Sequence, residues 1–397
     1  MEAYLLDWAN LLVRWLHLIA GIAWIGASFY FVMLDNSLKP PKNPNDAKRG
    51  VFGELWAVHG GGFYHSQKYL TGPKGEPLTQ DLHWSKWEAY TTWLSGMGMM
   101  AVIYWIGASS YLIDSSVMAL SPAAAVGISI AFLVAGWVFY DILCRNMIGK
   151  DGVLAAIVFV FVMVANYVLH QVFSARGAYI HVGAMLGTMM AANVFFHIIP
   201  GQKKMVEQIR RGEQVDPMPG IVGKQRSVHN TYFTLPVLFI MISNHYPMTY
   251  ANAKGWLVLG VLMLAGVLIR QFFVLRHRGQ VKWWLPAAGV ALIALLMVLM
   301  APKQVDAGGE KVSFATVKAI MAQRCIACHA DKPTFEGFAQ APKGVMLQTP
   351  EQIAAHAVMS AQTVASGYMP LGNLTAITEE EREKIAIWFA QGARTAD

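Results

Sequence analysis

Residues 153–173 read VLAAIVFVFVMVANYVLHQVF and contain no Asp, Glu, Lys or Arg. A helix of about 20 apolar residues is long enough to cross the hydrocarbon core of a membrane. The whole chain of 397 residues is 55% hydrophobic and only 14% charged. This composition excludes a disordered chain and argues against a soluble enzyme. The sequence therefore predicts a membrane protein.

Seven further stretches are apolar and long enough to span a membrane, so we expect about eight spans in an all-α bundle. The eight are residues 8–34, 89–112, 123–143, 153–173, 179–199, 232–248, 256–275 and 283–300. The sixth contains Pro236. Glu2 and Asp7 precede the first, whose apolar run is too long for a cleavable signal peptide. We expect that first span to remain in the mature protein.

The basic residues predict the orientation of the spans, because short cytoplasmic loops carry an excess of Lys and Arg. The loops on one side, which include a large insert at residues 35–88, hold 18 Lys and Arg, and the loops on the other side hold two. The N-terminus and the C-terminus should therefore both face outward. Because this topology accounts for most of the net charge of +7, we expect contact with membrane lipid and no nucleic-acid partner.

The composition becomes polar after Pro302, where about 95 residues contain nine Lys plus Arg and ten Asp plus Glu. We expect a membrane domain over residues 1–302, a linker at 303–311 and a water-soluble domain over 312–397. This soluble domain, called the tail below, contains the run CIACH from Cys325 to His329. Cys-x-x-Cys-His is the attachment motif for c-type haem, in which two thiols bind the haem and the histidine binds the iron. A redox dithiol or half a zinc site are the alternatives.

The tail is predicted to be a small class I cytochrome c. Phe314, Val317, Ile320 and Met321 recur at helical spacing before Cys325. Thr378 and Glu381 form a capping-box pattern that would open a last helix with Ile385, Trp388 and Phe389 on its apolar face. Candidate sixth ligands of the iron are Met321, Met346, Met359 and Met369. Met369, in the run Gly-Tyr-Met-Pro, is preferred, and Met321 suits a core position better.

Histidines of the membrane domain fall into two tiers. The outer tier contains His17, His170, His181 and His245, and the cytoplasmic tier contains His197 and His229. In each of two neighbouring spans the two histidines are 16 residues apart, or about 24 Å. His181 could then face His245, and His197 could face His229, as in membrane cytochromes that hold two b haems. Because 16 residues is not a whole number of turns, structural or catalytic roles remain open for these histidines.

The whole chain resembles the bacterial membrane urate oxidases, also called urate hydroxylases, in which an eight-span domain is fused to a C-terminal cytochrome c. The resemblance is carried by VHGGGFY at 58–64, LHWSKWEAYTTWLS at 82–95, ANV at 192–194 and RSVHNTYFTLPVLFIMISNHYP at 226–247, together with the two haem motifs. It implies an oxidoreductase of purine degradation in the bacterial inner membrane, with the cytochrome in the periplasm. The implied reaction is oxidation of urate to 5-hydroxyisourate, with electrons passing through the haem to a soluble cytochrome c or a terminal oxidase.

The resemblance leaves the catalytic residues open, and we hypothesise a pocket near the outer tier. His245 or His17 would act as base and Asn193 or Asn244 would bind the imide groups of urate. A competing placement on the cytoplasmic side uses His59, residues 60–62 and His83, where three glycines could cradle an anion or simply form a turn. Alternative functions are a cytochrome that oxidises quinol or another donor, and a transporter or copper-handling protein with a redox partner.

Overall fold

The computed structural model describes residues 2–252, 254–301, 310–335, 338 and 340–395. Helices make up 67% of it. The first part consists of α1 (Glu2–Ser37), α2 (Pro44–Lys48), β1 (Val51–His59), β2 (Gly62–Tyr69), α3 (Trp87–Met99), η1 (Met100–Trp105), α4 (Ala108–Tyr111), α5 (Pro122–Asn146), α6 (Asp151–His170), α7 (Ala175–Ala192), η2 (Asn193–Ile198), α8 (Ile199–Arg210), α9 (Met218–Ser243), α10 (Pro247–Tyr250), α11 (Gly255–His277) and α12 (Trp284–Leu299). The tail consists of α13 (Phe314–Arg324), η3 (Pro342–Gly344), α14 (Pro350–Ala355), α15 (Ala357–Ala365), η4 (Leu371–Asn373) and α16 (Glu379–Ala390).

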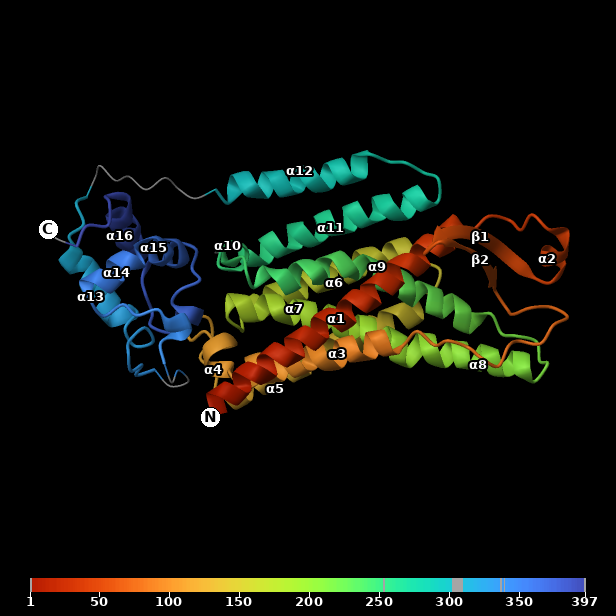
Figure 1. The fold of residues 1–397 in the computed structure, drawn as a ribbon, viewed down its shortest axis with the longest axis horizontal. Helices are drawn as coiled ribbons and strands as arrows, with labels where there is room; N and C mark the ends of the chain where they lie inside the picture. The colour runs from red at the N-terminus through yellow and green to blue at the C-terminus, as the bar shows by residue number, and fades with distance from the viewer. Residues whose placement is uncertain (1, 253, 302–309, 336–337, 339, 396–397) are drawn as a thin grey trace.

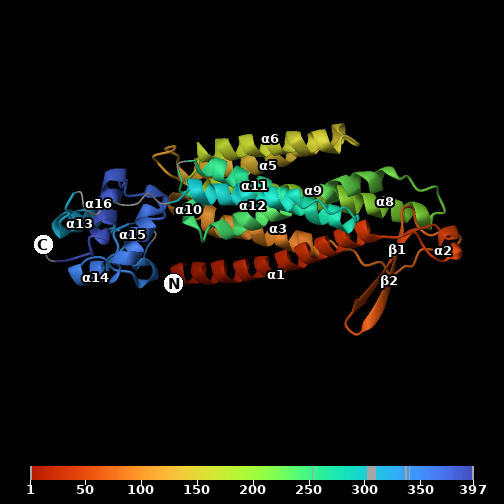
Figure 2. The ribbon, with the colours of Figure 1, turned by 90° about the horizontal axis from the view of Figure 1, so that it is seen from above.

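The long helices form one bundle, and the tail lies against one end of it (Figure 1). We call this end, where α4 and α10 lie, the tail end. The opposite end, with α2, β1, β2 and α8, is called the insert end. Figure 2 shows the β1–β2 hairpin projecting sideways from the insert end, beyond α1.

Each of the eight predicted stretches lies mostly in helix, with short breaks such as those at residues 106–107 and 244–246. Five helical stretches in the described part of the chain are long and apolar enough to cross a membrane: Tyr4–Ser37, Pro122–Asn146, Asp151–His170, Ala175–Arg210 and Gly255–His277. The segment 89–112 is divided among α3, η1 and α4, and α12 is a shorter apolar helix. Most of the predicted linker, 303–309, lies outside the described residues.

Two expectations need correction. The fold is not all-α, because the insert contains an antiparallel hairpin in which β1 pairs with β2. The sixth segment does not begin at residue 232, because α9 already begins at Met218 and continues through Pro236. The polar residues in its first turns had obscured this extension. Several of them, including Gln225, Arg226 and His229, are buried inside the bundle.

Capping side chains fix the first residues of bundle helices, and buried apolar side chains hold these helices together. The side chain of Ser121 accepts a hydrogen bond from the backbone of Ala124 at the start of α5, and Ser174 does the same for Gly177 in α7. The main core is built from α4 to α7 and α9 to α11, with Leu154, Leu169 and Met185 buried at its centre. Helix α7 therefore lies within the bundle.

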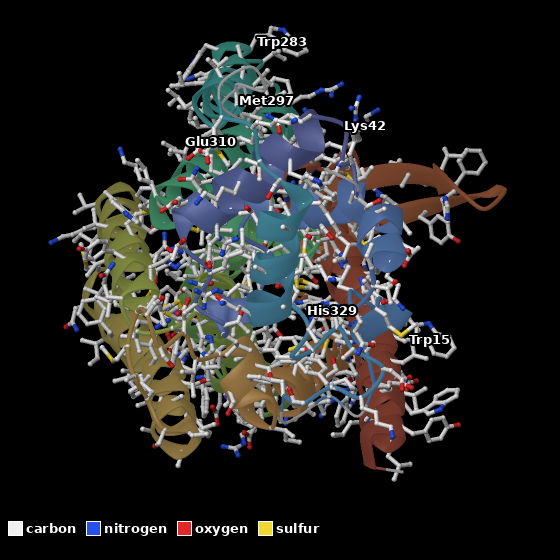
Figure 3. All side chains as sticks on the ribbon, turned by 90° about the vertical axis from the view of Figure 1, so that its left-hand side faces the viewer. Trp15, Lys42, Trp283, Met297, Glu310 and His329 are labelled. Atoms are coloured by element: carbon white, nitrogen blue, oxygen red, sulfur yellow. The ribbon has the colours of Figure 1, made fainter. Side chains whose placement is uncertain are left out.

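The outer surface of the bundle is apolar. Trp15 on α1 is 61% exposed, Trp283 before α12 is 69% exposed and Met297 on α12 is 71% exposed. Figure 3 shows Trp15 and Trp283 at the periphery of the molecule. A broad apolar surface of this kind is compatible with a membrane protein.

The tail has a separate core, and its helices form as predicted. Phe314, Val317, Ile320 and Met321 are all buried on one face of α13. The capping box of Thr378 and Glu381 is present at the start of α16, whose Ile385 and Trp388 are buried. Met321 is therefore confirmed as a core residue.

Candidate functional site

Three polar side chains from three helical segments meet at the tail end of the bundle. The Nε of Arg176, at the start of α7, donates to Oδ1 of Asn244 at 3.0 Å and to the hydroxyl of Tyr104 at 3.2 Å. The Arg176 guanidinium also lies over the ring of Tyr111, 5.1 Å from its centroid. Among the described residues, its two terminal nitrogens have no hydrogen-bond partner. They are available to an anion.

A cavity of about 220 Å³ lies beside Arg176, between the bundle and the tail. The bundle lines it with Tyr111, Asp114, Ser174, Arg176 and Tyr250, and the tail lines it with Gly367, Tyr368, Asn373, Glu379 and Arg382, among others. The buried hydroxyl of Tyr250 has no partner in the part of the chain that the structure describes. Because an unpaired buried hydroxyl costs free energy, it marks a place for a polar ligand atom or water. We call this the junction cavity.

The tail segment that carries Met369 is fitted closely to the bundle. Gly367 has a φ of +72°, and a Cβ added there would lie only 2.9 Å from the Cβ of Ala251. Tyr368 packs against the core of the bundle. Arg382 donates to the carbonyl oxygens of Met369, at 2.8 Å, and Val364, at 2.6 Å. The Met369 loop is thus held from both sides.

The CIACH run forms a tight turn directly after α13. The backbone N–H groups of Cys328 and His329 both donate to the carbonyl of Cys325, at 3.2 and 2.9 Å. The Nδ1 of His329 donates to the carbonyl of Val345 at 2.9 Å, which fixes the ring and leaves Nε2 for another ligand. Both cysteines are free thiols. The two thiols and the free Nε2 of His329 are the groups that a c-type haem needs from the protein.

The two alternatives for the cysteine motif gain no support. Burial raises the pKa of the Cys325 thiol to about 12, and burial also raises the pKa of Cys328. A redox dithiol needs a reactive thiolate, which a raised pKa disfavours. Within the described residues no group of three or more His, Cys, Asp or Glu side chains could hold a metal ion, so partners for half a zinc site are missing there.

A second polar cluster is buried nearer the insert end, and we call it the buried network. Nη2 of Arg226 lies 2.7 Å from Oδ1 of Asp141, and Nη1 donates to Oδ1 of Asn193 at 3.2 Å. The amide of Asn193 donates to the hydroxyl of Tyr140 and to Oδ1 of Asn230, both at 2.9 Å. The network therefore ties α5, η2 and α9 together. Its polar and charged side chains can be buried in an apolar bundle because they are paired with one another.

Two predicted histidines join this network. Nε2 of His197 donates to Oδ1 of Asp141 at 2.6 Å, and Nδ1 of His229 lies 2.8 Å from the hydroxyl of Tyr140. The π-helical turn η2 begins at Asn193 and contains His197. A π-helical turn widens the helix locally and is frequent at functional sites. The structure thus brings Asn193, His197 and His229 together, whereas the sequence had placed Asn193 with the outer tier.

The remaining predicted histidines lie elsewhere. His181 is fully buried, with Nδ1 donating to the carbonyl of Gly177 at 2.7 Å and Nε2 lying 2.6 Å from the hydroxyl of Ser129. His245 is exposed after α9. Nδ1 of His17 lies 3.0 Å from the Thr92 carbonyl. Among the described residues no contact joins His181 with His245, and both ring nitrogens of His181 are already engaged. A b haem at His181 would have to break one of these bonds.

The competing site in the insert is a turn. Gly60 and Gly61 have φ angles of +58° and +80° and connect β1 to β2. Two successive residues with positive φ form the type of turn that suits a two-residue hairpin. Nothing lies within 4 Å of a Cβ added at either glycine, so no cradle surrounds them. His59 and His83 are exposed, and no contact joins them in the described structure.

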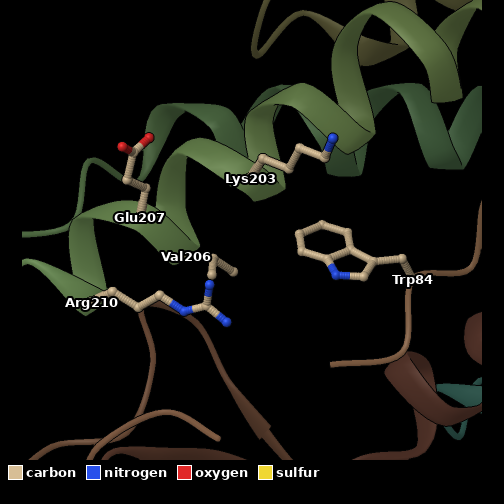
Figure 4. A pocket seen from close by; sticks show the side chains of 5 residues that line it. All are labelled: Trp84, Lys203, Val206, Glu207 and Arg210. Atoms are coloured by element: carbon tan, nitrogen blue, oxygen red, sulfur yellow. The ribbon is translucent and has the colours of Figure 1, made fainter. Parts of the chain in front are cut away.

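A different groove, with a volume of about 370 Å³, lies at the insert end (Figure 4). Its walls come from Trp84 of the insert and from Lys203, Val206, Glu207 and Arg210 of α8. It is open and lies apart from the tail. It was not predicted from the sequence.

Comparison with known proteins gives one match. The sequence model of the family described as Urate oxidase N-terminal matches residues 3–301. The chain belongs to this family. No curated protein and no solved structure matches it. Membership in the urate oxidase N-terminal family relates the chain to urate chemistry, and the matched region contains the buried network and the bundle side of the junction cavity.

Several residues of this urate oxidase N-terminal family member were missed as site candidates. Arg176 and Arg226 had been counted as loop cations, but Arg176 lies in α7 and Arg226 is buried in α9. Asp141 was the available signal, since it is an acidic residue inside an apolar stretch and therefore needs a partner. Tyr104 and Tyr250 gave no sequence signal, because tyrosine is common in such helices.

Proposed function

We propose that the protein oxidises urate to 5-hydroxyisourate in the junction cavity, with a c-type haem of the tail as the electron acceptor. Urate and water give 5-hydroxyisourate, two protons and two electrons. The proposal is supported by membership in the urate oxidase N-terminal family. The observation that carries it is the cavity itself, which has Arg176 and Asp114 in its bundle wall and, on its other side, the loop that bears Met369.

Four residues of the tail would hold the haem. Cys325 and Cys328 would offer the two thiols, His329 would offer Nε2, and Met369 would offer a thioether as a second ligand of the iron. When bound, a haem of this type accepts electrons one at a time. Buried Trp388 and Ile385 of the tail core would keep water from its apolar surroundings.

Arg176 is proposed to bind urate as an anion. Its Nε is held by Asn244 and Tyr104, so the side chain is already ordered before urate binds. Its two terminal nitrogens can then bind an anion without a further entropy cost for ordering the side chain. The unpartnered hydroxyl of Tyr250 can donate to a ring oxygen or nitrogen. The ring of Tyr111, under the same guanidinium, offers a flat apolar wall. Asn244, predicted as an imide partner, would act as a positioning residue for Arg176.

A base must take a proton from the attacking water. Asp114 lines the cavity, and its Oδ1 accepts hydrogen bonds from the backbone and side chain of Ser116, at 2.9 and 2.6 Å. We assign the role of base to Asp114. His245, the base predicted from the sequence, lies exposed next to Asn244 and is the alternative at this end of the bundle. His17 is held against α3 by Thr92 and Ser95 and does not line the cavity.

The proposed location is the bacterial inner membrane, with the bundle crossing it eight times and the tail in the periplasm. The charge asymmetry of the loops and the apolar outer surface of the bundle support this location. A soluble cytochrome c or a terminal oxidase would then receive the electrons from the tail. The buried network would remain a structural element of the bundle, and no b haem is needed.

The test uses the purified holoprotein under argon. Urate should lose its ultraviolet absorbance while the c haem becomes reduced, with two haems reduced per urate consumed. Arg176→Gln should slow this reaction at least tenfold at low urate concentration, because it removes the charge but keeps the length of the side chain. Lys282→Gln, an exposed change at the insert end, is the matched control. Reduction of the haem by dithionite should be unaffected in both.

The outcomes separate the proposed roles. Asp114→Asn should lower kcat, and His245→Ala should leave it unchanged; the reverse result would assign the base to His245. Haem reduction by a quinol but not by urate would replace urate oxidation with the alternative function of a donor-oxidising cytochrome. Unchanged kinetics in Arg176→Gln would remove the junction cavity as the urate site.

A further inference from the structure

The open groove at the insert end has an uncompensated positive charge. Helix α8 carries Lys203, Lys204 and Arg210, and Arg211 follows directly as its C-cap residue. Lys204 pairs with Asp216, and Arg211 pairs with Glu207. Lys203 and Arg210 form no ion pair within the described residues, and these two line the groove. Figure 4 shows both side chains extending toward Trp84, whereas the carboxylate of Glu207 points the other way.

The depth of the groove matches the headgroup layer of a membrane. Helices α7, η2 and α8 run on as one stretch, Ala175–Arg210, of 36 residues. At about 1.5 Å per residue, Phe195 lies about 30 Å from Ala175, which is the thickness of a hydrocarbon core. Lys203 lies about 12 Å farther along. Because each headgroup layer is several ångströms thick, the long side chain of Lys203 can reach back to the phosphate groups of a membrane whose core ends near Phe195.

An apolar strip leads from the groove toward the middle of the bundle. Trp84 packs against the cluster of Ala89, Val194 and Ile199. Phe195 and Phe196 are each 54% exposed, and the ring of Tyr90 contacts that of Phe195 with centroids 5.4 Å apart. A ligand with a phosphate in the groove could therefore lay a hydrocarbon chain along Phe195 and Phe196. A free phosphate would leave this strip uncovered.

We propose that this groove binds the headgroup of an anionic phospholipid. Lys203 contacts the phosphate, Arg210 attracts it from the aqueous end of the groove, the indole N–H of Trp84 donates to the headgroup, and an acyl chain covers Phe195 and Phe196. The proposal rests on the membrane location proposed above, but not on the urate reaction. The two can therefore fail separately, because one is measured by lipid binding and the other by haem reduction.

The experiment measures phospholipid binding to the detergent-purified, full-length holoprotein by native mass spectrometry. The probes are phosphatidylglycerol and phosphatidylcholine. Phosphatidylglycerol should bind more tightly than phosphatidylcholine. Lys203→Gln and Arg210→Gln should each lower the affinity for phosphatidylglycerol about fivefold, which is the usual contribution of one basic residue at an anionic lipid surface. The double variant should lose about 30-fold. Lys282→Gln is the matched control, because it removes an exposed positive charge at the insert end from a residue that does not line the groove, and it should bind like the parent protein.

Competition distinguishes lipid from free anion. Inorganic phosphate at millimolar concentration should not displace phosphatidylglycerol; if it does so and binds with equal affinity, the groove is an anion site and the lipid assignment is wrong. Equal binding of the two lipids, or unchanged binding by the double variant, would also overturn it. Brominated phosphatidylglycerol gives a second measurement on the folded parent, because it should quench less fluorescence in Trp84→Phe. Equal quenching would contradict the proposed contact.

Discussion

Nη2 of Arg226 lies 2.7 Å from Oδ1 of Asp141, and both side chains are buried inside the bundle. The same carboxylate oxygen accepts from His197, and Oδ2 accepts from Arg145 at 2.7 Å. A buried charge is tolerated only while its partner is present, and removal of one partner leaves the other uncompensated. This pair therefore locks α9 to α5.

Asp141→Asn should destabilise the bundle by about 3–5 kcal/mol, because it leaves Arg226 without a counter-charge in an apolar interior. The measurement is thermal unfolding in detergent, followed by far-ultraviolet circular dichroism. Replacing both partners by apolar residues, Asp141→Leu with Arg226→Met, should recover much of the loss. A single variant as stable as the parent would show that the pair contributes nothing.

Gly367→Ala should uncouple the tail from the bundle. A positive φ costs about 1–2 kcal/mol in a residue with a Cβ, and the new Cβ would also meet Ala251 at 2.9 Å. Reduction of the haem by urate should become slower, while reduction by dithionite stays the same. Gly344→Ala is the matched control, because Gly344 has a φ of +68° but no neighbour within 4 Å of an added Cβ. Equal effects of the two changes would mean that contact with the bundle is not the cause.

Acid should weaken the tail through Glu381. Burial alone would raise the pKa of Glu381, but the N–H of Thr378 and the guanidinium of Arg324 outweigh it and hold this pKa below its usual value of 4.5. A carboxyl with a lowered pKa in the folded state stabilises above the unfolded pKa and loses that contribution as the pH falls through the folded one.

The difference in melting temperature between the parent and Glu381→Gln should therefore be largest near pH 7 and shrink as the pH falls below 4.5 and through the lowered pKa of the folded state. Thermal unfolding of the holoprotein at a series of pH values, followed at the haem Soret band, measures it. Glu383→Gln, an exposed change on the same helix, is the control and should give a small difference at every pH. A difference for Glu381→Gln that does not vary with pH would argue against the role of this carboxylate.

Met369→His should lower the reduction potential of the haem, because a methionine ligand raises the potential relative to a second histidine. A redox titration of the purified protein measures the shift. Met359→His serves as the comparison, since Met359 lies on the exposed side of α15. An equal drop from Met359→His, or none from Met369→His, would assign the sixth ligand elsewhere.

The helices could be predicted from the sequence because an apolar run of about 20 residues is a local signal. Residues 153–173 and α6 agree closely for that reason. The capping box of Thr378 with Glu381 was equally local and is confirmed. The β1–β2 hairpin was missed as a structure, although the Gly60–Gly61 turn was one of the two interpretations considered.

The site residues could be predicted only in part. Asn193 and His197 come to the same cluster as Arg226 because η2 widens one turn of the helix and changes the direction of the side chains that follow. No count of residues along an ideal helix reproduces that change. The junction cavity depends on residues as distant in the sequence as Arg176 and Arg382, which line the same cavity only because of the way the tail packs on the bundle.

The close packing of the Met369 loop against α4 and α10 has a consequence for the proposed electron transfer. Gly367 touches Ala251, and a Cβ on Gly372 would lie 3.3 Å from the carbonyl of Ile113. Under the proposed function, a tail seated in this way would stay docked while it accepts electrons. A separate acceptor protein would then approach from the side of α13 and α14, which face away from the bundle (Figure 1).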